Sequence, residues 1–189
     1  MTITVQFQLA MQKTKLINRI IAGAMLSFAL VTQDGHIVSA QQRPTSLLRA
    51  KCVNSGLGSV RRNTLDVSIG KAVYTSLFYL GSGNRSASIT CKIRKVDSQP
   101  LFQTLQLGFG MRDNNTTSPP VNINVYLDGK QAETRTVAPT NQESLSLNVS
   151  DVTNVSIEAV CSSQAIYCDR VYFFDAALEP IILSPTPSK

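Results

Sequence analysis

The sequence predicts an all-β protein built as an antiparallel β-sandwich, and three observations support this fold class. Apolar and polar residues alternate with a period of two in successive segments, as in VNINVYL at residues 121–127, and this pattern is typical of strands with one buried face. Residues that favour turns separate these segments at short intervals. No segment after residue 40 has helical periodicity. Such strands, eight or more in number, indicate two stacked sheets.

The first 40 residues have the features of a secretory signal peptide. Lys13, Lys15 and Arg19 precede an apolar run of 12 residues at 20–31, and the small residue Ala40 follows a polar spacer. The run is short for a membrane anchor, which needs roughly 20 residues, so an uncleaved anchor is the weaker alternative. We therefore expect cleavage after Ala40 and a secreted protein, extracellular or periplasmic, with no stable membrane anchor after cleavage.

The predicted mature chain is mildly basic. The sequence has 18 basic and 12 acidic residues, of which residues 1–40 contain three and one, so 15 and 11 remain for a net charge of +4. A nucleic-acid-binding surface would cluster such charges beside aromatic side chains. The only basic runs are Arg61-Arg62 and KIRK at 92–95, and we interpret both as solvated strand faces. No nucleic-acid partner is predicted, whereas weak attraction to acidic surface polysaccharide stays open.

All four cysteines, Cys52, Cys91, Cys161 and Cys168, lie in the predicted mature chain. An even number of cysteines in an exported protein predicts two disulfides, which can be connected in three ways. We favour a bridge between Cys161 and Cys168 that closes the loop SSQAIY, which leaves Cys52 for Cys91. A zinc site is the weaker alternative, because the mature chain has no histidine and no close Cys-x-x-Cys pair.

Period-two segments follow one another along the mature chain, with polar turns between them. The residues expected to be buried in the first four are Leu65, Val67 and Ile69; Ile89, Cys91 and Ile93; Leu101, Leu105, Leu107 and Phe109; and Val121, Ile123, Val125 and Leu127. In the last three they are Leu145, Leu147 and Val149; Val155, Ile157 and Ala159; and Val171 and Phe173. Asp128-Gly129 supplies the positive φ angles of a tight hairpin. Residues 41–179 are thus predicted to form one domain, and residues 180–189 a flexible Pro- and Ser-rich tail.

The mature chain offers no recognisable catalytic group. The only histidine, His36, lies in the predicted signal peptide, so the side chain that most often serves as general acid, general base or zinc ligand is lost. The acidic residues are scattered singly, and most fall in turns, where Asp is favoured for backbone reasons. We therefore predict a protein that is not an enzyme and that uses no cofactor and no metal ion.

Four stretches in the second half of the chain occur in the same order as similar stretches in a known protein family. They are LFQTLQLGFGMRDNN at 101–115, VNINVYLDGKQ at 121–131, SLSLNVSDVTNVSIEAV at 144–160 and DRVYFFDAAL at 169–178. In this order the chain, from about residue 65 to 179, resembles the NPCBM family of carbohydrate-binding modules. The resemblance implies a galactose-binding-like jelly roll, with Asp169 in the place of a leading acid and with Asp175 and Ala176 as direct matches.

The chain departs from the NPCBM pattern in two places. Phe173 stands where the family usually has a Trp, and the stretch at 74–83 lacks the glycines and the His that the family shows at the matching place. The chain has no Trp at all, so we do not expect a flat stacking face for crystalline polysaccharide. The resemblance therefore implies the fold more strongly than any sugar specificity.

The sequence suggests a secreted, non-catalytic carbohydrate-binding protein whose partner is a glycan or a cell-surface polysaccharide. Loops on a rigid sandwich commonly carry binding residues, and the candidates here are Arg112, Asp113, Asn114, Tyr167, Asp169 and Arg170. Tyr167 is the aromatic residue expected to be exposed. Two other interpretations stay open: an ion pair between Asp169 and Arg170, and a loop at 112–120 that is either a plain polar turn or a source of oxygens for a hard cation.

The alternative function is a structural or adhesive protein of the cell envelope that binds another protein and has no dedicated sugar pocket. It is favoured by the absence of a catalytic domain next to the predicted sandwich, because binding modules usually lie beside an enzyme. Five Asn-x-Ser/Thr sequons would accept glycans in a eukaryotic source. They begin at Asn84, Asn114, Asn115, Asn148 and Asn154.

Overall fold

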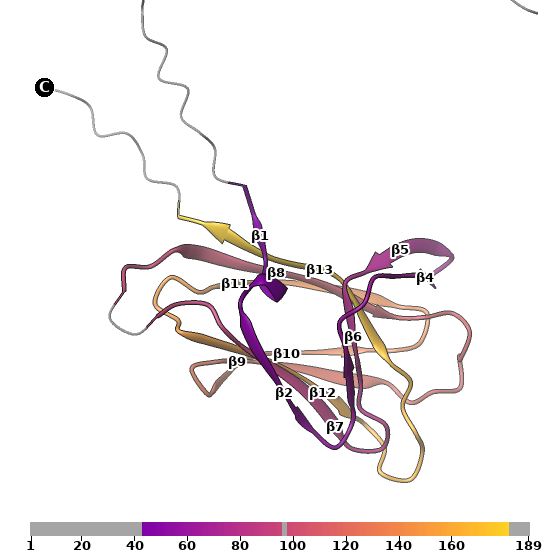
Figure 1. Ribbon diagram of the computed structural model, residues 1–189. Coiled ribbons are helices and arrows are strands. Elements are labelled where there is room, and N and C mark those ends of the chain that lie inside the picture. The colour runs from indigo at the N-terminus through magenta and orange to yellow at the C-terminus, as the bar shows by residue number, and fades with distance from the viewer. Residues whose placement is uncertain (1–42, 96–97, 182–189) are drawn as a thin grey trace, which may run out of the picture. The chain divides into compact units, whose positions relative to one another are not determined.

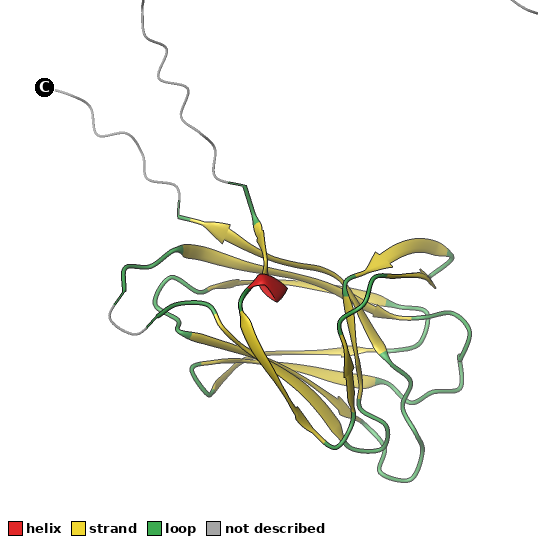
Figure 2. Cartoon of the chain, viewed as in Figure 1, coloured by secondary structure: helices red, strands yellow, loops and turns green. Residues whose placement is uncertain are grey.

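Thirteen strands and one three-residue 3₁₀ helix make up the regular structure of residues 43–95 and 98–181, the ranges that the computed structural model describes (Figure 2). The predicted all-β fold class is confirmed. The predicted signal peptide at 1–40 and most of the predicted tail at 180–189 lie outside these ranges. Within them, no helix has the length and hydropathy needed to cross a membrane.

Eleven strands form two antiparallel sheets that face each other (Figure 1). Sheet A has the order β11-β8-β13-β6-β3, with short β1 paired to β13, and sheet B has the order β10-β9-β12-β7-β2. The strands of sheet A are β1 (Thr45–Ser46), β3 (Ser59–Arg61), β6 (Phe78–Gly81), β8 (Phe102–Met111), β11 (Gln142–Asn148) and β13 (Val171–Pro180). Those of sheet B are β2 (Lys51–Gly56), β7 (Ser86–Lys92), β9 (Val121–Leu127), β10 (Lys130–Val137) and β12 (Asn154–Cys161), and the helix η1 (Leu47–Arg49) joins β1 to β2.

Apolar side chains from both sheets fill the space between them. Phe78, Phe109 and Phe173 of sheet A are fully buried, and their ring centroids lie 4.4 Å (Phe78 and Phe173) and 5.3 Å (Phe109 and Phe173) apart. Full burial of one such ring contributes about 2 to 3 kcal/mol. Alternate residues of sheet B, such as Ile123 and Ile157, face these rings and are also fully buried. The period-two pattern therefore predicted the inner faces of both sheets.

The pattern was wrong at two positions. Leu65 is 42% exposed and Leu101 is 58% exposed. Leu65 begins a strand outside the main sheets, and Leu101 precedes β8, so neither reaches the space between the sheets. At the other end of the chain, β13 continues to Pro180, the first residue of the predicted tail.

A hairpin of β4 (Leu65–Ile69) and β5 (Ala72–Ser76) covers part of the outer face of sheet A (Figure 1). Val67 and Ile69 from β4 pack against Tyr172 of β13, and all three side chains are buried in a second, smaller core. Gly110 of β8 makes this approach possible, because a Cβ atom at that position would lie 2.9 Å from Ile69 Cγ2. The outer face of sheet A is therefore covered at its centre.

Both predicted disulfides are confirmed. Cys52 and Cys91 are directly opposed residues of β2 and β7, and Cys161 and Cys168 close the loop between β12 and β13. The predicted hairpin is confirmed as well, since Asp128 and Gly129 both have positive φ, at 47° and 80°. The bridges fix the edge strand β2 and one end of the sandwich.

We predict that the two disulfides contribute unequally to stability. A disulfide restricts the unfolded chain more when the bridged residues lie farther apart in sequence. The expected stabilisation from this loss of entropy is about 4 kcal/mol for Cys52–Cys91, separated by 39 residues, and about 2.5 kcal/mol for Cys161–Cys168, separated by 7. Cys52→Ala/Cys91→Ala should therefore lower the free energy of unfolding in guanidinium more than Cys161→Ala/Cys168→Ala. A larger loss in the second double variant would contradict this order and would show that the short bridge stabilises the native loop directly.

Candidate functional site

The two loops that carry the predicted binding residues are joined at one end of the sandwich. Arg112 follows β8 and donates through Nε and Nη2 to the Asp169 carboxylate, at 3.0 and 3.3 Å. The backbone N–H of Asp169 donates to Ser118 Oγ at 2.8 Å. Asp169 is buried and its ion pair is with Arg112, so the interpretation that paired it with Arg170 named the wrong partner. The pair links the loop at 112–120 to the start of β13.

Asp113 holds the turn of the β4–β5 hairpin. One carboxylate oxygen accepts from Ser68 Oγ at 2.5 Å and from the Lys71 N–H at 3.0 Å, and the other accepts from the Gly70 N–H at 2.7 Å. The turn needs this support because Gly70 and Lys71 both have positive φ, at 59° and 67°. The hydrogen bond from Ser68 and then that from the Lys71 N–H lower the pKa of Asp113 below its ordinary value.

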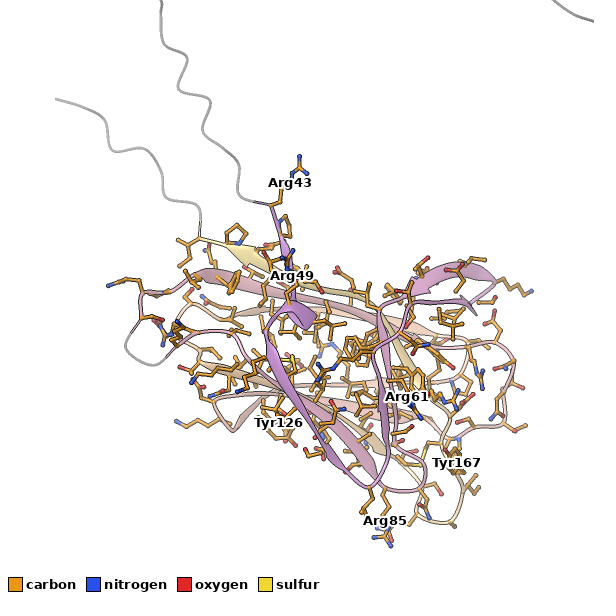
Figure 3. The ribbon with its side chains drawn as sticks, in the orientation of Figure 1. Arg43, Arg49, Arg61, Arg85, Tyr126 and Tyr167 are labelled. Atoms are coloured by element: carbon orange, nitrogen blue, oxygen red, sulfur yellow. A yellow bond between two sulfur atoms is a disulfide. The ribbon has the colours of Figure 1, made fainter. Side chains whose placement is uncertain are left out.

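Tyr167 lies on the disulfide-closed loop and points into solvent. Its side chain is 66% exposed, which confirms the expected exposure. The ring rests on Gly83, where an added Cβ would lie 3.2 Å from Tyr167 Cε2, and the next residue, Cys168, donates its N–H to Gly83 O at 2.7 Å. Asn114 is exposed on the loop between β8 and β9. Figure 3 shows Tyr167 at one end of the sandwich.

Arg170, the last predicted residue, stacks on an aromatic ring of sheet A. Its guanidinium carbon lies 4.7 Å from the centroid of the Tyr79 ring, a cation-π distance. Tyr79 is half-buried on the outer face of β6, opposite Arg61 of β3 on one side and Tyr172 of β13 on the other. The predicted residue Arg170 is thereby joined to a surface that the sequence did not indicate.

That surface is an open hollow at the end of the edge strand β3, which we call the β3 hollow. Its volume is about 540 Å³, within the usual range for small-ligand sites. Arg62 lies where the chain leaves β3, and its Nη2 donates to the Cys52 carbonyl at 3.0 Å and to Asn54 Oδ1 at 3.2 Å. The lining residues are Asn54, Val60, Arg61, Arg62, Asn63 and Tyr79.

A second, smaller hollow of about 390 Å³ lies on the outer face of sheet B. Its polar side chains are already hydrogen-bonded to one another: Tyr126 Oη donates to the Glu158 carboxylate at 3.0 Å, and Thr90 Oγ1 donates to Ser156 Oγ at 2.9 Å. Burial and then the bond to Glu158 raise the pKa of Tyr126 above its ordinary value. The lining residues are Ser88, Thr90, Tyr126, Gly129, Asn154, Ser156 and Glu158.

The loop at 112–120, a possible source of cation ligands by its sequence, uses its side-chain oxygens within the protein. The Asp113 oxygens are engaged by the β4–β5 turn, and Asn115 Oδ1 accepts from Thr117 Oγ1 at 3.1 Å. Among residues 43–95 and 98–181, no group of three or more His, Cys, Asp or Glu side chains could hold a metal ion.

Sequence reasoning missed most of the β3 hollow. Arg61 and Arg62 were interpreted as a solvated strand face, and alternation along a strand would place them on opposite sides. The structure brings both to the same hollow because β3 ends at Arg61 and Arg62 turns back toward β2. In the sequence, the hollow was indicated only by the run Arg61-Arg62-Asn63, which follows the polar residues of the edge strand β2 a few positions earlier.

Comparison with solved structures shows that the fold is shared with carbohydrate-binding modules. CBM51-2 in complex with GlcNAc and INT domains from Clostridium perfringens ZmpB matches with TM-score 0.58 and 16% identity over 73% of this chain. CBM51 from Clostridium perfringens GH95 in complex with methyl-galactose matches with TM-score 0.57 and 14% identity over 72% of this chain. This chain spans 32% of the first structure and 99% of the second.

At these identities the likeness establishes the fold alone, an antiparallel β-sandwich like that of these modules. No family model matches the sequence, and no curated protein matches it. The resemblance to the NPCBM family is thus supported in its expected fold, through structural neighbours that are carbohydrate-binding modules, and membership of that family is not shown.

We predict that Asp113→Asn lowers the melting temperature at pH 7. Because its pKa is depressed in the folded protein, ionised Asp113 stabilises the fold above the unfolded pKa of about 3.9, and this contribution is lost as the pH falls through the folded value. The difference between wild type and variant should therefore shrink below about pH 4. The matched control, Asp151→Asn, removes a carboxylate from an exposed turn. An equal loss in both variants would contradict the specific role of Asp113.

Proposed function

We propose that this chain is a secreted, non-catalytic carbohydrate-binding protein that holds a glycan in the β3 hollow. Its fold supports this proposal, because structures with the same fold contain CBM51 modules, one in complex with GlcNAc and one in complex with methyl-galactose. The two disulfides are consistent with export to an oxidising compartment.

The single observation that carries the proposal is the composition of the β3 hollow. Val60 and the half-buried Tyr79 ring, on which Arg170 stacks, offer apolar contact, the Asn63 amide offers donors and an acceptor, and the Asn54 amide nitrogen and the guanidinium groups offer further donors. Sugars present C–H faces and hydroxyl groups, so they need one aromatic contact and several oriented polar groups. The β3 hollow provides this combination.

The side chains of the β3 hollow lack the acid and base groups that most glycoside hydrolases use. Its lining includes no carboxylate, histidine, cysteine or lysine, whereas glycoside hydrolysis generally needs a pair of carboxyl groups. Guanidinium groups stay protonated and cannot act as general bases near neutral pH. Binding without turnover is therefore the function that this hollow supports.

The test is a glycan array probed with the purified chain and with variants of the β3 hollow. Tyr79→Leu removes the aromatic face and keeps an apolar side chain, and Asn63→Ala removes one exposed amide. Each should weaken saturable glycan binding about tenfold, the loss expected for one or two interactions of about 1 kcal/mol. Thermal unfolding of both variants checks that the fold is intact.

Tyr167→Ala is the matched comparison, because it removes an exposed tyrosine from the loop that the sequence predicted to bind. Glycan binding that is lost in Tyr167→Ala and kept in Tyr79→Leu would move the site to that loop. A blank array together with retained association to cell surfaces would instead support the alternative, an adhesive envelope protein with a protein partner.

A further inference from the structure

Positive charge is concentrated at the β3 hollow. Arg61 and Arg62 line it, and Arg170 stacks on the Tyr79 ring that forms one wall. None of its lining residues carries a negative charge. Resting on the proposed glycan-binding function, we infer that the β3 hollow selects acidic glycans, with the anionic group of the sugar bound by these guanidinium groups.

Arg61, Arg62 and Arg170 form no ion pair in the part of the chain that the structure describes. The ion pairs found there are Arg112 with Asp169 and Arg135 with Glu133. Asp169, the acid next to Arg170 in sequence, is engaged by Arg112. Arg61 and Arg62 line the hollow, Arg170 lies on the Tyr79 ring beside it, and no lining residue is acidic, so this concentration of positive charge is suited to an external anion.

Two of the three guanidinium groups are held in place by neutral contacts. Arg62 is fixed by the Cys52 carbonyl and the Asn54 amide oxygen, both bound through Nη2, so its other N–H groups stay free for a ligand. Arg170 is positioned by the Tyr79 ring. Orienting these groups before binding reduces the entropy lost when an anion is bound.

The chemistry of arginine fits an anionic sugar better than a neutral one. The planar guanidinium fork matches the two oxygens of a carboxylate or of a sulfate and binds them through paired, charge-assisted hydrogen bonds. Tyr79 and the two amides then contact the sugar ring and its hydroxyl groups. Single-stranded nucleic acid fits less well, because its recognition uses several aromatic platforms in succession, and the β3 hollow has one.

The experiment measures binding of the purified full chain to three polymers by affinity electrophoresis and calorimetry. Polygalacturonate carries carboxylates, dextran sulfate carries sulfates, and neutral galactan carries neither. We expect at least one acidic polymer to bind at least tenfold more tightly than galactan. Comparison of the two acidic polymers distinguishes a uronic acid from a sulfated sugar, and either result supports the inference.

Three variants locate the binding of the acidic polymer. Arg61→Gln and the double variant Arg61→Gln/Arg62→Gln should weaken it, the double variant at least tenfold. Arg85→Gln is the matched control, because Arg85 is exposed on the turn between β6 and β7, away from Arg61 (Figure 3), and it should change the affinity less than twofold. Arg61 lies on an exposed edge strand, so its single variant tests the site even where the double variant unfolds.

The outcomes separate this inference from the function on which it rests. Equal affinity for galactan and for the acidic polymers, lost in Tyr79→Leu, would overturn charge selectivity and leave glycan binding intact. Binding of no glycan at all would overturn both. Equal weakening by Arg85→Gln and Arg61→Gln, or tighter binding to a mixed-sequence oligonucleotide than to either acidic polymer, would replace the site with unspecific attraction between charges.

Discussion

The β4–β5 hairpin covers only part of the outer face of sheet A, and the position of the proposed binding surface depends on where this cover ends. One row of outward-facing residues crosses four strands, from Arg61 through Tyr79 and Tyr172 to Gly110. The hairpin lies over Gly110 and Tyr172, because the missing Cβ at Gly110 lets Ile69 come close. Tyr172 is consequently fully buried, Tyr79 is half-buried and Arg61 is exposed. The uncovered part of this row is the wall of the β3 hollow.

Two consecutive residues at the end of β8 hold the surrounding parts in place. Arg112 binds Asp169 at the start of β13, and Asp113 binds the turn of the β4–β5 hairpin. The chain leaves β8 at Arg112 and turns at Asp113, so these two neighbours in sequence reach different elements. Arg112, Asp113 and Asp169, all predicted as ligand contacts, therefore have clear structural partners, whereas Arg170 faces the Tyr79 ring beside the hollow.

The sequence predicted those features that depend on local pattern. Strands buried on one face, such as 121–127, alternate strictly, and the two disulfides followed from the seven-residue separation of Cys161 and Cys168. The edge strands β2 and β3 were missed, because one of them is exposed at nearly every position and the other has three residues. The β3 hollow joins residues of β2, β3 and β6, and only the pairing of these strands brings the residues together. A local pattern contains no information about that pairing.

The two hollows differ in the charge that their hydrogen-bonded side chains present to a ligand. On sheet B, Tyr126 is paired with Glu158 and Thr90 with Ser156, so a ligand there would exchange existing hydrogen bonds for new ones with a small net gain. Glu158 would also repel an anionic ligand. In the β3 hollow, the guanidinium of Arg62 is fixed by two neutral acceptors and keeps its charge uncompensated. A charged group that is oriented but not neutralised gains most from an anionic partner, which is why the β3 hollow, and not the sheet B face, is the site that we propose for an acidic glycan.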